Sequence, residues 1–398
     1  MSPRGHAPGE PAYRRLTVAL FLAGLVSFAA IYCTQPLLPL LGEAFGRSPA
    51  ETALTVSATT IALGLALLFL GPVSDAIGRT TVMLASLWAT GLVTLAGALV
   101  HSWHLLLALR LLVGVCAAGL PAVAVAYLRE EVTPAFASRA TGLYIGGTAL
   151  GGMSGRLVSG LLADLWGWRA AVLGIGLLAL VCAAAVQHLL PRSTAFVAQP
   201  LDPAGLTRKT LALLRSPVQL GLMAMSLCAM GAFVACFNAM GFRLEGPPYH
   251  LSVGVAGLVF LVYAFGSWSS ARAGRAAQDR GPAVVALGGL AIHLAGIVLL
   301  TARPLLLVLV GLALTTIGFF AAHGVASGWV AAAAAQRGLG TAQAASLYLF
   351  AYYLGSSVAG TAAGWAWSSH GWPGVTVLTG SLVLLAGLAV TLAHRGSR

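Results

Sequence analysis

The chain has 398 residues, of which 59% are hydrophobic and only 8% are charged, and its mean hydropathy is +0.90. A typical soluble domain has about 25% charged residues, so this composition excludes a soluble globular protein. The formal net charge of +12 comes from basic residues that stand singly between apolar runs. Because they form no basic stripe, we expect no nucleic-acid partner.

The five cysteines also lie inside apolar runs, and their spacing matches neither a metal site nor a disulfide framework. We interpret them as small buried hydrophobic residues. The sequence therefore predicts neither a metal nor a cofactor.

Twelve apolar segments follow one another, each near the ~20 residues that a membrane-spanning helix needs. Six lie at about 17–42, 51–73, 80–100, 104–128, 138–163 and 169–190, and six more at about 218–242, 252–271, 282–302, 304–332, 339–366 and 373–394. The sequence predicts an all-α membrane protein with twelve transmembrane helices. The expected domains are two six-helix bundles, at 1–190 and 218–398, joined by a connecting segment at 191–217.

The basic residues are distributed unequally between alternate connections. One set of connections contains sixteen Lys and Arg residues, including those near both termini, and the other contains four: Arg47, Arg169, Arg243 and Arg303. Cytoplasmic loops carry the excess of Lys and Arg in multi-pass membrane proteins. We therefore expect both termini and the connecting segment in the cytoplasm.

The second and third apolar segments are joined by a charged loop that contains Gly71, Asp75, Gly78 and Arg79. Glycine lets helices approach closely, and Asp75 can face the positive N-terminal end of a helix from the other half. The alternative is that these charges only sort the loop to the cytoplasm. A degenerate copy of the loop begins at Gly274, 203 residues later, which indicates an internal repeat of the two halves.

In its spacing and its place among twelve segments, this loop resembles the signature loop of the major facilitator superfamily. The resemblance implies two halves that rock around a central site. It also implies that Gly71, Asp75, Gly78 and Arg79 form a conformational latch, which holds the cytoplasmic side shut and does not bind cargo. We call these four residues the latch.

Other stretches carry the resemblance further. The run Arg110-Leu111-Leu112-Val113-Gly114 is similar to the fourth-span motif of the superfamily, in which the Arg has been proposed to take part in proton transfer, although Val113 stands where a Gln is often found. The runs 32–39, 151–160 and 266–270 resemble the YnfM-type permeases of bacterial inner membranes. Gly155-Arg156 replaces the Gly-Pro pair of the superfamily's antiporters. This resemblance covers nearly the whole chain.

Arg110 and Arg156 are the two basic residues inside the predicted spans, each roughly 12 Å from the periplasmic end at 1.5 Å per residue. A charge at that depth usually faces a water-filled cavity, and snorkelling toward the interface is the alternative. Pro36 and Pro39 interrupt the first span and free carbonyl groups toward a cavity. From depth and polarity, the predicted substrate-binding residues are Tyr32, Gln35, Arg110, Arg156, Asn238 and Tyr352.

All ten Asp and Glu residues fall in loops or at span ends, so no carboxylate stands at mid-membrane to carry a proton. The candidates for proton coupling are therefore Arg110, His293, His323 and the rim carboxylate Glu43. The alternative for each His is a hydrogen-bonded packing role.

We interpret the chain as a secondary active transporter that moves a small polar or amphipathic molecule across the bacterial inner membrane by alternating access. We expect export by proton antiport, an anionic cargo because the two arginines lack an acidic partner, a lipid environment and a monomer. Nutrient uptake by proton symport or facilitated diffusion remains an alternative.

An intramembrane enzyme would need a carboxylate pair, a metal cluster or a nucleophile beside a His, and the spans contain only scattered Ser and two unpaired His. A receptor would carry a soluble domain. We therefore expect neither an enzyme nor a receptor.

Overall fold

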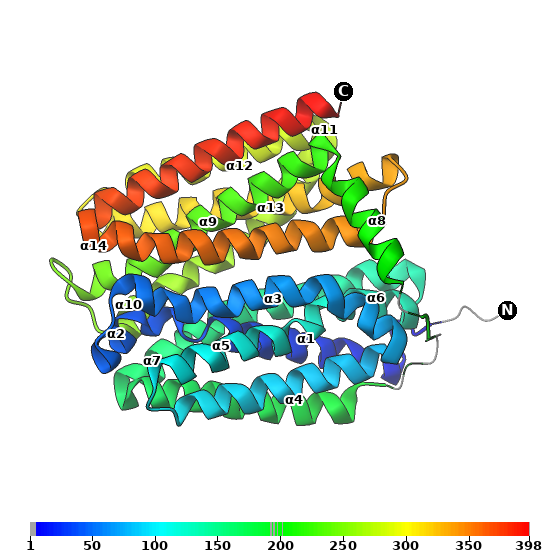
Figure 1. Cartoon of the computed structure of the whole chain (residues 1–398), viewed down its shortest axis with the longest axis horizontal. Coiled ribbons are helices and arrows are strands. Elements are labelled where there is room, and N and C mark those ends of the chain that lie inside the picture. Colours follow the sequence, from blue (N-terminus) through cyan, green and yellow to red (C-terminus); the bar gives the residue numbers. More distant parts are fainter. Residues whose placement is uncertain (1–4, 192, 194–195, 197, 201, 398) are drawn as a thin grey trace.

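The structure is a computed structural model that describes residues 5–191, 193, 196, 198–200 and 202–397 (Figure 1). Within these residues the regular structure is helical, apart from one isolated bridge between His6 and Val132. The elements are α1 (Pro11–Tyr32), η1 (Gln35–Leu37), α2 (Leu38–Phe45), α3 (Pro49–Ile77), α4 (Arg79–Ala98), α5 (Trp103–Ala117), α6 (Gly119–Glu131), α7 (Pro134–Leu189), α8 (Pro203–Leu214), α9 (Pro217–Glu245), α10 (Val253–Gly257), η2 (Leu258–Tyr263), α11 (Ala264–Arg280), α12 (Pro282–Leu299), α13 (Leu305–Gln336) and α14 (Thr341–Gly396).

Ten helical stretches of the described chain are long and apolar enough to cross a membrane. Two of them, α7 and α14, have 56 residues each, and each changes direction at a glycine with positive φ, Gly167 at 80° and Gly371 at 60°. Glycine adopts this conformation without the steric cost that a Cβ atom would bring. Each long helix therefore supplies two spans, which brings the total to twelve and confirms the predicted fold class.

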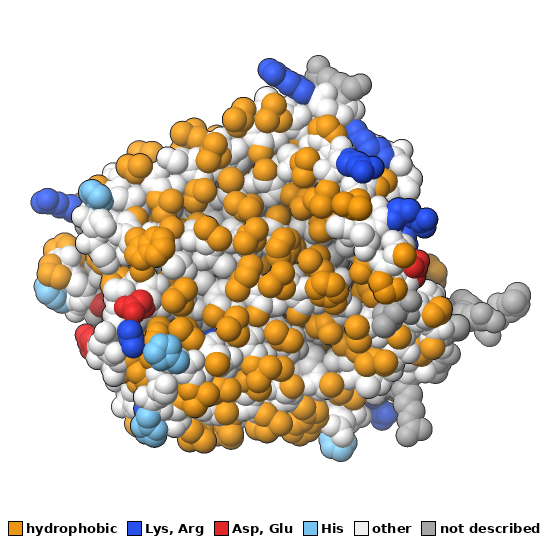
Figure 2. Space-filling view, in the orientation of Figure 1, with side chains coloured by type: hydrophobic (Ala, Val, Ile, Leu, Met, Phe, Trp, Pro, Cys, Tyr) orange, Lys and Arg blue, Asp and Glu red, His pale blue; other side chains and the backbone are white. Residues whose placement is uncertain are grey.

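The helices form two halves (Figure 1). Helices α1 to α7 pack against one another in one half, and α9 to α14 in the other, while α8 lies at the end that carries both chain termini. We call this the terminal end and the opposite end the distal end. Figure 2 shows that hydrophobic side chains cover the middle of one face, while charged and His side chains gather toward its two ends. A surface with this distribution suits a lipid environment.

Glycines bring α1 and α7 into direct backbone contact. At Gly147, Gly151 and Gly155 a Cβ atom would overlap the backbone of Phe21, Leu25 and Ala29. Small residues at this spacing allow the van der Waals packing that associates helices in lipid, where the hydrophobic effect between helices is absent.

The first span is broken between α1 and α2, where Gln35-Pro36-Leu37 forms a short 3-10 turn. Helix α1 ends at Tyr32, so the carbonyl groups of its last turn have no intrahelical partner, and Pro36 has no N–H with which to extend the ladder to Tyr32 O. Arg110 of α5 takes them: its guanidinium donates to Ala30 O at 3.1 Å and to Ile31 O, and its Nε donates to Thr55 O of α3 at 3.1 Å. Arg110 thus fastens three helices of one half together.

The two halves meet most closely toward the distal end. Across α3 and α14, Thr60 Oγ1 lies 2.8 Å from Ser357 Oγ, and Thr361 Oγ1 donates to Ser57 Oγ at 2.9 Å. Still closer to the distal end, Ser252 Oγ beside α10 donates to Asp164 of α7 at 2.9 Å. The distal end is therefore closed by direct contacts between the halves.

Gly151→Ala should destabilise the protein, because the new methyl group overlaps the Leu25 carbonyl and must push α1 and α7 apart. Overpacking of this kind costs about 1–3 kcal/mol. The matched control is Gly146→Ala on the same helix, since nothing lies within 4 Å of its Cβ position. We expect a fall of several degrees in the thermal midpoint of the purified protein for Gly151→Ala and none for Gly146→Ala. Equal midpoints would contradict this packing.

Arg110→Lys should also destabilise the protein, although it keeps the charge. A single ammonium group cannot reach carbonyls on both α1 and α3 in the way that a planar guanidinium does. Each buried carbonyl left unpaired costs about 1–3 kcal/mol. The same change at the exposed Arg303 serves as the control in thermal denaturation. Wild-type stability combined with lost transport would instead place Arg110 in the transport mechanism.

Candidate functional site

Arg156 of α7 lies between the two halves and has only 2% of its surface exposed. Its guanidinium carbon lies 4.0 Å from the ring centroid of Tyr32, 4.8 Å from that of Tyr263 and 5.1 Å from that of Phe260. Tyr32 ends α1, whereas Phe260 and Tyr263 belong to η2 in the other half. The charge is thus held by rings from both halves, an arrangement that stabilises a cation.

A chain of hydrogen bonds connects Arg156 to the second half. Arg156 donates through Nε to the side-chain oxygen of Gln35 and through Nη1 to Gly152 O. Gln35 Nε2 donates to Asn238 Oδ1 of α9 at 2.7 Å, and Asn238 Nδ2 donates to Gly360 O of α14 at 3.3 Å. Four spans from both halves therefore meet at one buried polar network.

The network contains a positive charge and no negative one. The described residues include all ten Asp and Glu of the chain, and none of them forms an ion pair with Arg156. A charge inside a membrane protein usually has a partner or faces a pathway. Arg156 is therefore a buried charge whose contacts among the described residues are neutral hydrogen-bonding groups and aromatic rings.

Four of the six predicted binding residues meet at this network: Tyr32, Gln35, Arg156 and Asn238. Tyr352 lies beside it, because it packs against the apolar cluster that contains Tyr32. Arg110 lies apart, with its donors on carbonyl groups of α1 and α3. These contacts favour a structural function for Arg110, and its binding function stays a prediction.

The latch lies at the terminal end, within one half. Arg79 forms an ion pair with Asp75 and donates through Nη2 to Glu130 Oε1 at 2.8 Å. Gly78 has a φ of 107°, which favours glycine at the turn between α3 and α4, and Gly71 has open space around it. The Asp75 carbonyl accepts a bond from Gln199 N of the connecting segment. Closure of the terminal end by the latch stays a prediction.

The candidates for proton coupling have very different surroundings. His293 is fully buried, and neither ring nitrogen has a hydrogen-bond partner among the described residues. His323 is partly exposed, and its Nδ1 lies 3.0 Å from Tyr348 Oη. Glu43 is exposed at the distal end. His293 packs edge-on against Phe233 and Phe319, which fits a packing residue, whereas His323 stacks on Phe319 and lies beside Tyr352.

Some residues of the site escaped sequence reasoning. Phe260 looks like an ordinary apolar residue of a span, and Tyr263 is one of several polar residues at mid-span; only the fold shows that both rings lie against Arg156. The hydroxyl pairs between α3 and α14 could have been expected from the sequence. Ser57 and Thr60 are three residues apart and Ser357 and Thr361 are four apart, the spacing that puts two residues on one face of a helix.

Glu245 at the distal end of α9 was also missed. It lines a narrow cavity that extends to Gln35, between α9 and α10. Its Oε1 is buried without a hydrogen-bond partner in the part of the chain that the structure describes, and the acidic groups Glu43 and Asp164 are near enough to act on it electrostatically. A buried carboxylate oxygen without a partner costs free energy unless the carboxyl group holds a proton.

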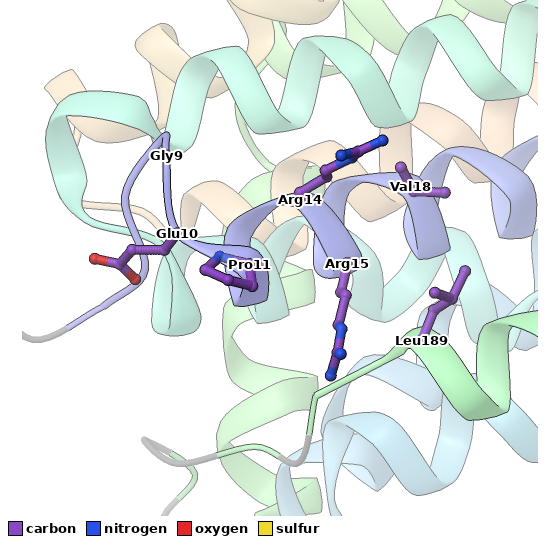
Figure 3. A pocket seen from close by; sticks show the side chains of 7 residues that line it. All are labelled: Gly9, Glu10, Pro11, Arg14, Arg15, Val18 and Leu189. Atoms are coloured by element: carbon purple, nitrogen blue, oxygen red, sulfur yellow. The ribbon is translucent and has the colours of Figure 1, made fainter.

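A larger hollow of about 600 Å³ lies at the terminal end, between the first turn of α1 and the end of α7 (Figure 3). Its lining residues come from one half only, and they include Arg14, Arg15, Val18 and Leu189. Figure 3 shows the two arginine side chains pointing in different directions from α1. Because it touches only one half, this hollow is not the place where the halves enclose a cargo.

Comparison with known proteins relates the chain to membrane transporters. The chain is 42% identical over 387 residues to the inner membrane transport protein YnfM of Escherichia coli, covering 97% of this chain and 92% of that protein. It is 38% identical to the uncharacterized MFS-type transporter YybF of Bacillus subtilis, covering 95% and 93%. The resemblance to YnfM-type permeases is thereby confirmed.

The fold is shared with solved transporters. A bacterial homologue of the human lysosomal transporter Spinster, in an inward-facing and occupied conformation, matches with a TM-score of 0.79 at 15% identity, covering 98% of each chain. The family model described as Major Facilitator Superfamily matches residues 20–345. The chain is therefore a multi-pass membrane transporter of a small molecule and not an enzyme, and it belongs to the major facilitator superfamily.

Proposed function

We propose that the chain transports a small organic anion, which binds at Arg156 between the two halves. The observation that carries this proposal is a buried guanidinium that no carboxylate neutralises and that both halves contact. A cargo with a negative charge supplies the missing partner. Gln35 and Asn238 place hydrogen-bonding groups beside it.

The closed distal end supports an inward-facing conformation in this proposal. In this proposal the terminal end lies in the cytoplasm and the distal end in the periplasm, the orientation that the excess of Lys and Arg predicts. Contacts such as Ser252 to Asp164 and Thr361 to Ser57 then seal the periplasmic side, so the site exchanges cargo with the cytoplasm. The opposite conformation breaks these contacts and brings the latch against the other half.

We further propose that a monomer exports the cargo from the cytoplasm across the inner membrane, in exchange for protons. A site that faces the cytoplasm loads its cargo there. Glu245 is the carboxyl group whose position suits proton uptake and release, because it lies between the periplasmic face and the cavity that reaches Gln35. Glu43 lies at the same end but is exposed.

Arg156→Gln should abolish anion flux while the protein still folds, because glutamine keeps hydrogen-bonding groups but removes the charge. We expect at least a ten-fold loss of radiolabelled organic-anion flux in proteoliposomes, which corresponds to about 1.4 kcal/mol. Arg303→Gln removes the same charge from an exposed distal loop and should leave the flux unchanged. Unchanged flux in Arg156→Gln would rule out the proposed site.

Glu245→Gln should uncouple protons from cargo, since the amide cannot take up and release a proton. In proteoliposomes with an internal pH-sensitive dye, we expect the cargo-dependent pH change to disappear while passive exchange of labelled cargo persists. Glu43→Gln makes the same change on an exposed carboxylate of the same end. Loss of coupling in Glu43→Gln but not in Glu245→Gln would show that Glu43, and not Glu245, carries the proton. Cargo flux without proton movement in the unmodified protein would refute antiport.

A further inference from the structure

The two halves contribute different chemistry to the site. The half formed by α1 to α7 supplies the charge of Arg156. The other half supplies a continuous set of rings: Tyr263 contacts Phe233 at 5.4 Å and Phe320 at 6.1 Å between centroids, and Phe233 stacks on Phe319 at 4.3 Å with an interplanar angle of 14°. Phe319 in turn stacks on the ring of His323. We call the rings of Tyr263, Phe233, Phe319, Phe320 and His323 the aromatic wall. The charge of Arg156 lies at the edge of this wall.

Part of this wall is uncovered. Tyr263, Phe320, His323 and Tyr352 are each partly exposed, whereas Phe233 and Phe319 behind them are buried. Tyr352 lies 4.8 Å from His323 and 6.2 Å from Phe319 between ring centroids, so it adds a further ring to the wall. A flat molecule bound here meets ring faces and edges over several ångströms.

The charged edge has unused donors. Arg156 donates through Nε to Gln35 Oε1 and through Nη1 to Gly152 O. Its Nη2 has no hydrogen-bond partner among the described residues. The hydroxyl of Tyr263, whose ring centroid lies 4.8 Å from the Arg156 guanidinium carbon, is buried without a hydrogen-bond partner among the described residues. Two donors on neighbouring side chains can serve the two oxygens of one carboxylate. A sugar would need many more polar partners, and an ammonium group would be repelled by Arg156.

From this arrangement we infer that the cargo is an aromatic carboxylate, whose carboxylate binds Arg156 and the Tyr263 hydroxyl and whose ring lies against the wall formed by Tyr263, Phe320 and Tyr352. The inference rests on the proposed function, because it assumes an anion at Arg156. It adds the requirement for an aromatic ring. Aromatic pairs prefer offset or edge-to-face contacts, which a saturated ring of similar size cannot reproduce.

The test compares three small probes on the purified protein: benzoate, cyclohexanecarboxylate with the same charge and a saturated ring, and benzamide with the same ring and no charge. Binding is measured by isothermal calorimetry and by competition with radiolabelled benzoate in proteoliposomes. We expect benzoate to bind about three-fold to ten-fold more tightly than cyclohexanecarboxylate, the range given by one or two aromatic contacts, and benzamide not to compete.

Variants of Tyr263 separate the ring from the hydroxyl. Tyr263→Phe should weaken both acids equally and keep their ratio, because it removes only the donor. Tyr263→Leu should bring the ratio toward one, and Tyr249→Leu in the distal loop should leave it unchanged.

The outcomes distinguish the two proposals. Equal binding of both acids would overturn the aromatic requirement and leave an anion site at Arg156 intact. Binding of benzamide as tight as that of benzoate would overturn the carboxylate and with it the proposed function. Absence of binding by all three probes would overturn both proposals.

Discussion

The break in the first span is the constraint on which the rest of the site depends. Helix α1 ends at Tyr32, just before Pro36, and two carbonyls of its last turn accept the donors of Arg110, so the break is stabilised inside the half where it forms. At the same break Gln35 lies against Arg156 and Asn238. In a continuous helix the carbonyls of Ala30 and Ile31 would bond to backbone N–H groups of the next turn, and Arg110 would have to share them. The break therefore supports both the contacts of Arg110 and the network around Arg156.

The internal repeat explains why two carboxamides meet at the centre. Gln35 and Asn238 are separated by 203 residues, the offset that relates the two copies of the charged loop. They occupy equivalent places in the two halves, and a pseudo-two-fold axis between the halves brings such residues together. Arg156 breaks the symmetry, because the residue at the same offset is Ala359. The repeat thus builds a symmetric bridge, and one half adds the charge.

The sequence was sufficient for the spans but only partly for the site. Apolar length is read directly from hydropathy, so the twelve spans were predictable, and so was the gathering of Tyr32, Gln35, Arg156 and Asn238 near the centre. Depth alone could not separate Arg110 from Arg156. Both stand equally far inside the membrane, and the difference lies in which face of the helix meets the carbonyls of α1. Glu245 looked like a rim residue because its burial depends on packing between the halves.

On the proposed function, an unpaired charge also explains why movement depends on cargo. Without an anion, Arg156 relies on Gln35, Gly152 O and three rings, contacts that favour the conformation with a closed distal end. Opening that end separates η2 from α7 and exposes the guanidinium to a new environment. An anion that binds Arg156 in both conformations neutralises the charge throughout the movement. It therefore lowers the free energy needed to break these contacts and change conformation. A transporter with this feature moves readily when loaded and slowly when empty, which is the behaviour that obligatory exchange requires.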